Sequence, residues 1–210
     1  LRMSYKTEQE SFWAGKFGDE YIDRNIGDKL LASNLSFFSK ALNKTSKIRS
    51  CIEFGANIGM NLNALSLIFP KIDLCAVEIN EAAVSILKDD LPKALILNKS
   101  ILDFLPEKKW DLVLIKGVLI HLNPDVLKDV YKTLYESSFR YILIAEYYNP
   151  TPVQIEYRGH EGKLFKRDFC GEILDQFNDL ALVDYGFSYH RDNNFPQDDI
   201  SWFLLEKGSR

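Results

Sequence analysis

The 210-residue sequence has few cysteines and no long apolar stretch, and each absence excludes a class of protein. Its three cysteines, Cys51, Cys75 and Cys170, form no C-x-x-C pair, and their odd number argues against a disulfide framework. No apolar run reaches the length that a membrane span requires, and the N-terminus shows no signal-peptide pattern. We therefore expect free, buried thiols in a cytoplasmic protein without membrane contact.

The sequence also lacks an excess of positive charge, which nucleic-acid binding favours, and a cluster of histidines, which metal binding favours. Lysine and arginine number 26 against 30 acidic residues, a net charge of −4, so a nucleic-acid surface covering the whole protein is not expected. The histidines at 121, 160 and 190 are scattered and form no metal-ligand cluster. Repeats and low-complexity tracts are absent. We expect one globular unit, a small-molecule substrate, no metal, and a monomer or homodimer.

The chain does contain a regular alternation of apolar strands and amphipathic helices. Five mostly apolar runs predict parallel strands, and two later runs predict an antiparallel hairpin. The expected strands cover residues 50–54, 72–78, 94–97, 110–115, 140–146, 181–189 and 201–205. The pattern therefore predicts a Rossmann-like α/β fold with a mostly parallel seven-stranded sheet, a C-terminal antiparallel hairpin and helices on both faces.

An aromatic-rich N-terminal segment precedes the first strand. We expect residues 1–45 to form a helical cap and residues 46–210 to form the main domain of the same globular unit. Two compatible interpretations apply to residues 7–25, because the aromatic side chains can pack as a cap or close over a ligand as a lid. In the second interpretation the residues that face a substrate are Trp13, Tyr21, Arg24 and Asn25.

A glycine loop follows the first strand. The stretch from Glu53 to Gly59 has the pattern acidic-x-Gly-x-x-x-Gly, and a helix is expected to begin at about Met60. Glycine tolerates positive φ and lets a backbone approach a small molecule closely. The dinucleotide fingerprint G-x-G-x-x-G would need glycines in place of Asn57 and Met60. The pattern instead resembles the first motif of class I S-adenosylmethionine-dependent methyltransferases, which implies that cofactor and its product S-adenosylhomocysteine.

Ligands of open α/β sheets bind beyond the carboxyl ends of the strands, where the chain order reverses. In the family, the acidic residue at the position of Glu53 reaches the methionine part of the cofactor, directly or through water. A carboxylate at Glu78 can accept hydrogen bonds from both ribose hydroxyls, although taken alone it reads as a surface carboxylate. The expected cofactor-binding residues are Glu53, Gly55, Ala56, Asn57, Gly59, Glu78, Ile79, Ser100, Ile101, Lys116 and Gly117.

The acceptor of the methyl group is expected beside the fourth strand. His121 lies just past that strand and could act as a base or substrate contact, or could be a structural histidine. Residues 153–166 are expected to be irregular, and their basic residues either form a solvated loop or hold an anionic acceptor. The expected catalytic residues are His121, His160 and Tyr147. The expected substrate-binding residues outside the N-terminal segment are His121, Tyr148, Asn149, Arg158 and Lys166.

Four stretches carry a more specific resemblance. They are residues 10–13 with 17–21 (ESFW and FGDEY), 55–61 (GANIGMN), 146–150 (EYYNP) and 158–163 (RGHEGK). Together they are similar to the pseudaminic acid biosynthesis-associated methylase family. The resemblance implies a methyltransferase, and we expect its acceptor to be a small, polar and anionic metabolite such as a nonulosonic or nucleotide-activated sugar. The alternatives are methylation of a peptide or protein side chain and a non-catalytic cofactor-binding partner protein.

Overall fold

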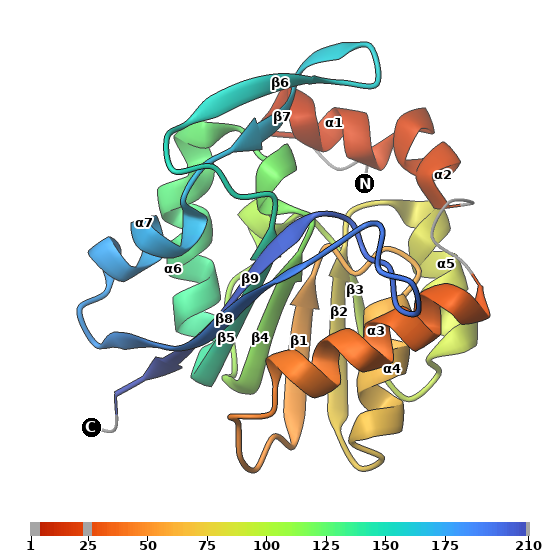
Figure 1. Ribbon diagram of the computed structural model, residues 1–210. Helices are drawn as coiled ribbons and strands as arrows, with labels where there is room; N and C mark the ends of the chain where they lie inside the picture. Colours follow the sequence, from red (N-terminus) through yellow and green to blue (C-terminus); the bar gives the residue numbers. More distant parts are fainter. Residues whose placement is uncertain (1–4, 23–26, 209–210) are drawn as a thin grey trace.

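The computed structural model describes residues 5–22 and 27–208, which build a seven-stranded sheet with helices on both faces (Figure 1). The strand order is β3-β2-β1-β4-β5-β9-β8. The parallel strands are β1 (Ser50–Phe54), β2 (Asp73–Glu78), β3 (Leu95–Asn98), β4 (Trp110–Lys116) and β5 (Ser138–Glu146). Strand β9 (Ile200–Lys207) is antiparallel to both β5 and β8 (Leu180–Ser188). The predicted fold is confirmed.

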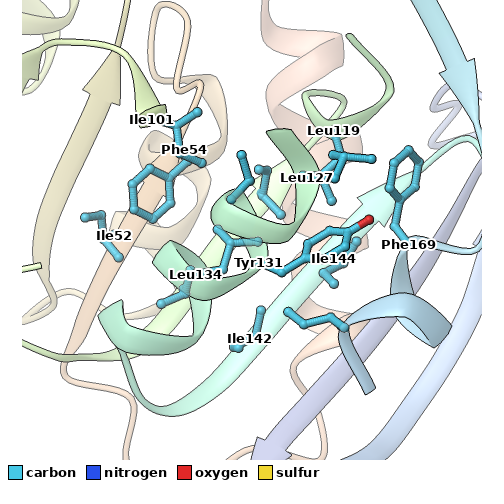
Figure 2. Close-up of a cluster of buried hydrophobic side chains, with 14 of the residues drawn as sticks. Ile52, Phe54, Ile101, Leu119, Leu127, Tyr131, Leu134, Ile142, Ile144 and Phe169 are labelled. Atoms are coloured by element: carbon cyan, nitrogen blue, oxygen red, sulfur yellow. The ribbon is translucent and has the colours of Figure 1, made fainter. Parts of the chain in front are cut away.

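Side chains alternate between two core layers along each strand. One layer packs Ile142 and Ile144 of β5 against α6 (Leu127–Ser137) and α7 (Phe169–Gln176), with Tyr131 and Leu134 of α6 among its members (Figure 2). The other layer is covered by α3 (Asp28–Ala41), α4 (Met60–Ile68) and α5 (Glu81–Asp90). Three short 3₁₀ turns complete the main body, η1 (Ile101–Asp103), η2 (Leu119–His121) and η3 (Pro124–Val126).

Residues 153–166 form an antiparallel hairpin, so the prediction of an irregular segment is wrong. Strands β6 (Val153–Tyr157) and β7 (His160–Lys166) are joined by Arg158 and Gly159, whose φ angles of 52° and 82° are both positive. Two consecutive positive φ angles are typical of the tight turns that match the twist of a hairpin. The sequence of β6, VQIEY, alternates apolar and polar residues, a strand signal that the prediction missed, although most of the strand is solvent-exposed.

The described helices of the N-terminal segment occupy two different places in the fold. Helices α1 (Glu8–Ala14) and α2 (Lys16–Ile22) lie with the hairpin over the carboxyl ends of the strands (Figure 1). In contrast, α3 buries Phe37, Phe38 and Ala41 in the main core, because its apolar face packs on the sheet. The cap therefore consists of α1 and α2 among the described residues. No helix in the described ranges is long and apolar enough to cross a membrane.

Candidate active site

A cavity of about 490 Å³ lies at the carboxyl ends of β1, β2 and β4. It sits where the chain order reverses, since β1 leads to β2 and β3 on one side and β4 leads to β5 on the other. Its volume falls within the range of about 300–1,000 Å³ that is usual for small-molecule sites. The strand-end loops form its floor, α1 and α2 its roof, and α3 with the β8–β9 loop its side.

The glycine loop follows β1 as predicted and lines the cavity. Gly55 has a φ of +73°, and a Cβ there would lie 2.4 Å from Cγ2 of Val118. Gly59 has a φ of +84°, and a Cβ there would lie 2.6 Å from Cδ2 of Leu87. Both contacts are with the protein itself, so packing of the loop against its neighbours already requires glycine at these positions. Asn57, with a φ of 47°, is a residue type that tolerates this conformation.

Glu78 ends β2 and lines the cavity while being almost fully buried. Its Oε2 accepts a hydrogen bond from the backbone N–H of Asn57 (2.7 Å), and its Oε1 accepts one from that of Asn80 (2.7 Å). Burial raises the pKa of the carboxyl above its ordinary value, and these backbone hydrogen bonds oppose that rise. The carboxylate is therefore fixed in position, with the glycine loop tied to it.

Glu53 stands behind the cavity wall instead of lining it. It is fully buried, and Nδ2 of Asn61 donates a hydrogen bond to its Oε1 at 2.6 Å. Asn61 is the residue of this pair that lines the cavity. Burial raises the pKa of Glu53 to about 8, partly offset by Asn61 and Lys116. No described residue gives a hydrogen bond to its Oε2.

The ends of β3 and β4 contribute the remaining predicted cofactor residues. Ser100 is buried, caps η1 by accepting a hydrogen bond from the N–H of Leu102 (3.0 Å), and lines the cavity with Ile101. Lys116 and Gly117 also line it. Ala56, Asn57 and Ile79 do so as well, whereas Gly59 does not.

Glu146, at the end of β5, supports the β4 loop and was not predicted as a site residue. Its Oε1 accepts hydrogen bonds from the N–H groups of Val118 and Leu119, both at 2.9 Å. Burial raises its pKa to about 7, against the effect of these bonds. Its place as a carboxylate ending a buried strand was the available signal. The bonds fix the loop that carries the cavity wall from Gly117 to His121.

His121 is buried between aromatic side chains at the cavity. Its ring lies 4.5 Å from that of Trp13 and 4.8 Å from that of Tyr157. Its Nδ1 is 2.7 Å from the carbonyl oxygen of Lys163. A carbonyl only accepts, so Nδ1 carries the proton and Nε2 keeps a lone pair. Burial lowers the pKa of His121 to about 4, so the ring is neutral at pH 7.

The cap is fastened to the hairpin and to α5 by long-range contacts. The Lys163 ammonium pairs with Glu8 of α1, and Nε2 of Gln9 donates to the carbonyl of Gly162 at 2.9 Å. On the other side, Nδ2 of Asn80 donates to Asp19 of α2 at 2.8 Å. The cap thus closes over the cavity, and Trp13 and Tyr21 line it as the lid interpretation predicts. Arg24 and Asn25 lie outside the described residues.

The β8–β9 loop forms a side of the cavity that was not predicted. His190, Pro196, Gln197 and Asp198 line it. Nε2 of Gln197 donates to Oδ1 of Asn34 in α3 at 2.8 Å, which ties the loop to α3. These residues are more than 150 positions from Asn34 in sequence. Only the folded chain brings them together.

The other predicted acceptor residues do not converge on the cavity. Tyr147 does not line the cavity; its hydroxyl bonds to Asp198, which does, and burial raises the pKa of the phenol. His160 is exposed and packs on Phe12 at 5.0 Å. Within the described chain, Tyr148, Asn149, Arg158 and Lys166 also lie outside the lining. Arg158 sits at the hairpin turn, Asn149 bonds to Thr151 (2.6 Å), Tyr148 faces Phe203 (6.1 Å) and Lys166 lies over Tyr147 (5.2 Å).

The fold is that of class I S-adenosylmethionine-dependent methyltransferases. The plantazolicin methyltransferase BpumL, solved with S-adenosylhomocysteine and a desmethylPZN analog, is 15% identical with a TM-score of 0.67 over 96% of this chain and 95% of its own. Magnesium protoporphyrin IX methyltransferase from Synechocystis, solved with S-adenosylmethionine, is 12% identical with a TM-score of 0.66 over 98% and 100%. A methyltransferase from Leishmania major is 14% identical with a TM-score of 0.70 over 95% and 87%.

No family model matches the chain, and no curated protein matches it either. The resemblance to the pseudaminic acid-associated methylases therefore stays a prediction. No group of histidine, cysteine or acidic residues in the described part of the chain is arranged to hold a metal ion.

Proposed function

We propose that this protein is an S-adenosylmethionine-dependent methyltransferase that acts on a small polar molecule. The observation that carries the proposal is the roofed cavity at the switch point, where Glu78, Ser100 and the glycine loop meet His121. Two of the solved neighbours hold S-adenosylmethionine or its product, which supports the same cofactor here.

The Glu78 carboxylate is suited to accept hydrogen bonds from the ribose hydroxyls of that cofactor. Each carboxylate oxygen accepts one backbone N–H and has a second lone pair for a hydroxyl. Ser100 and Ile101 would hold the adenine, and the loop from Gly55 to Asn57 would hold the rest of the nucleoside. When bound, the cofactor supplies an electrophilic methyl group on a positively charged sulfur.

His121 would orient the acceptor. Because Nδ1–H donates to Lys163, the Nε2 lone pair can accept a hydrogen bond from a hydroxyl or amine group. With a pKa of about 4, the ring cannot store a proton at neutral pH. We therefore assign it the alignment of the nucleophile, a contribution that methyl transfer depends on.

The acceptor is a small polar molecule, with a nonulosonic or nucleotide-activated sugar as the working candidate. Two of the basic residues in and just after β7 already have acidic partners. Lys163 pairs with Glu8, and Arg167 pairs with Glu172. The proposal therefore does not require a negative charge on the acceptor. A peptide side chain is less suited, because α1 and α2 cover the cavity and would have to move aside for a longer chain.

Calorimetry with S-adenosylmethionine and S-adenosylhomocysteine tests the cofactor. Glu78→Gln should weaken both affinities at least about tenfold, as loss of charge-assisted hydrogen bonds implies. The matched control is Glu81→Gln, three positions away and exposed, which should change neither affinity. Equal effects of the two substitutions would contradict the ribose assignment. Release of S-adenosylhomocysteine with sugar acids or nucleotide sugars then tests catalysis, and binding without release would favour a non-catalytic partner.

A further inference from the structure

Lys116 presents an unpaired cation to the cavity. It is the last residue of β4, is partly buried, and lines the cavity wall. Among the described residues, none forms an ion pair within 4.0 Å or a hydrogen bond with its ammonium group, which lies 5.7 Å from the centre of the Phe37 ring. Removing a charge from water without a partner is costly, so this ammonium is suited to receive an anion.

Glu53 lies on the same face of the neighbouring strand. It pairs in register with Leu114 of β4, and Lys116 is two residues farther along. Side chains two positions apart on a strand point to the same face. The acid connects to the cavity through Asn61, which donates to Glu53 and itself lines the wall. The wall thus carries the Lys116 ammonium and the Asn61 amide, with the buried Glu53 carboxyl behind them.

The surrounding charges favour the protonated form of Lys116. Burial is the larger effect and lowers the pKa of Lys116 overall, whereas the nearby charges of Glu53, Asp198 and Glu146 oppose that lowering. The side chain reaches toward α3, on the sheet face that holds Phe37. Leu119 and Ile120, which precede His121, belong to the opposite core layer. Lys116 is therefore directed away from the place proposed for the methyl acceptor.

We propose that the Lys116 ammonium binds the carboxylate of the amino-acid part of S-adenosylmethionine. The resemblance places Glu53 near the methionine part of the cofactor, and Lys116 lies beside Glu53 on the neighbouring strand, where it can reach the carboxylate of that amino acid. The inference rests on the proposed function and adds a side chain that selects cofactors with an intact amino-acid tail.

The test compares S-adenosylhomocysteine with 5′-methylthioadenosine, which has the same nucleoside but no amino-acid tail. Calorimetry gives the ratio of the two affinities for each variant. Lys116→Met should weaken S-adenosylhomocysteine about tenfold to a hundredfold, the usual value of a hydrogen bond to a charged group, and leave 5′-methylthioadenosine unchanged. Lys116→Arg should retain most of the ratio. Lys99→Met, which removes the other cavity-lining lysine, is the matched control and should leave the ratio unchanged.

Two outcomes would overturn the inference. If Lys116→Met weakens the binding of both ligands equally, Lys116 has a structural role. If the affinity for S-adenosylhomocysteine is unchanged, the ammonium does not bind the cofactor. Lys116→Gln provides a second variant should the methionine variant not fold. If the unmodified protein binds neither ligand, the proposed function itself fails, which is distinct from a failure of Lys116 alone.

Discussion

Replacing Gly55 by alanine tests how tightly the glycine loop is packed between β1 and the β4 loop. The substitution adds one methyl group to a residue with a φ of +73°, and that methyl would lie 2.4 Å from Cγ2 of Val118. Val118 cannot yield easily, because its backbone N–H is held by Glu146 and its branched side chain has few rotamers. We expect a loss of stability with two separable causes.

The magnitudes follow from these two causes. An alanine in the left-handed region costs about 1–2 kcal/mol, and overpacking of a filled site costs about 1–3 kcal/mol. Gly55→Ala should therefore lower the free energy of unfolding by about 2–5 kcal/mol. Gly117 offers a matched control, because its φ is +67° and a Cβ there would meet nothing within 4 Å. Gly117→Ala should show the conformational cost alone.

Thermal and urea unfolding of the two variants would measure the difference. For a chain of this length each kcal/mol lowers Tm by about 2–4 °C, so Gly55→Ala should melt several degrees below Gly117→Ala. Adding Val118→Ala to Gly55→Ala should recover part of that difference, because it removes the opposing methyl groups. Equal melting temperatures for the two glycine variants would refute the packing argument.

Three further predictions concern the buried titratable side chains Glu53, His121 and Lys163. The pKa of Glu53 is about 8 in the folded state, so its contribution to stability is present below pH 4.5 and is lost as pH rises to 8. The Glu53→Gln variant should therefore become more stable relative to the unmodified protein as pH rises over that range, by at most about 1.4 kcal/mol per pH unit. Urea unfolding at several pH values measures this, and a difference in the free energy of unfolding that does not change with pH would contradict the raised pKa. The ring of His121 should begin to protonate only near pH 4 when followed by NMR, and a midpoint above 6 would refute its neutral role. Lys163→Met should increase hydrogen exchange and proteolysis of α1, whereas Lys16→Met, at an exposed pair with Glu20, should not.

Regular elements could be predicted because their signals are local. The strand Ser50–Phe54 and the start of α4 at Met60 occur where the apolar run and the glycine loop place them. Asn80 caps α5 through a hydrogen bond from the N–H of Ala83 (2.9 Å). Because parallel strands share one orientation, the residues that follow them were expected to share one edge. In the structure, Glu78, Ser100 and Lys116 do line the same cavity.

The acceptor side could not be predicted in the same way, because it depends on contacts between distant segments. The hairpin does have local signals, the alternating run VQIEY of β6 and Arg158 before Gly159, but β7 does not alternate. Within β7, Lys163 and Lys166 are three positions apart and so project from opposite faces of the strand. Lys163 turns toward the cap and Lys166 toward Tyr147. A run of basic residues in sequence therefore becomes a set of separate contacts in space.

These contacts change which part of the molecule should decide the acceptor. The carbonyl of Lys163 bonds to His121 while its ammonium pairs with Glu8 of α1, so one residue of the hairpin positions both the ring proposed to align the nucleophile and the helix above it. The opposite side is set by the β8–β9 loop, which Gln197 ties to α3. If Lys116 serves the cofactor, recognition of the acceptor depends on neutral and acidic groups such as His121 and Asp198. Hydroxyl and amine groups donate hydrogen bonds to such residues, and we therefore expect them, and not a carboxylate, to face this wall.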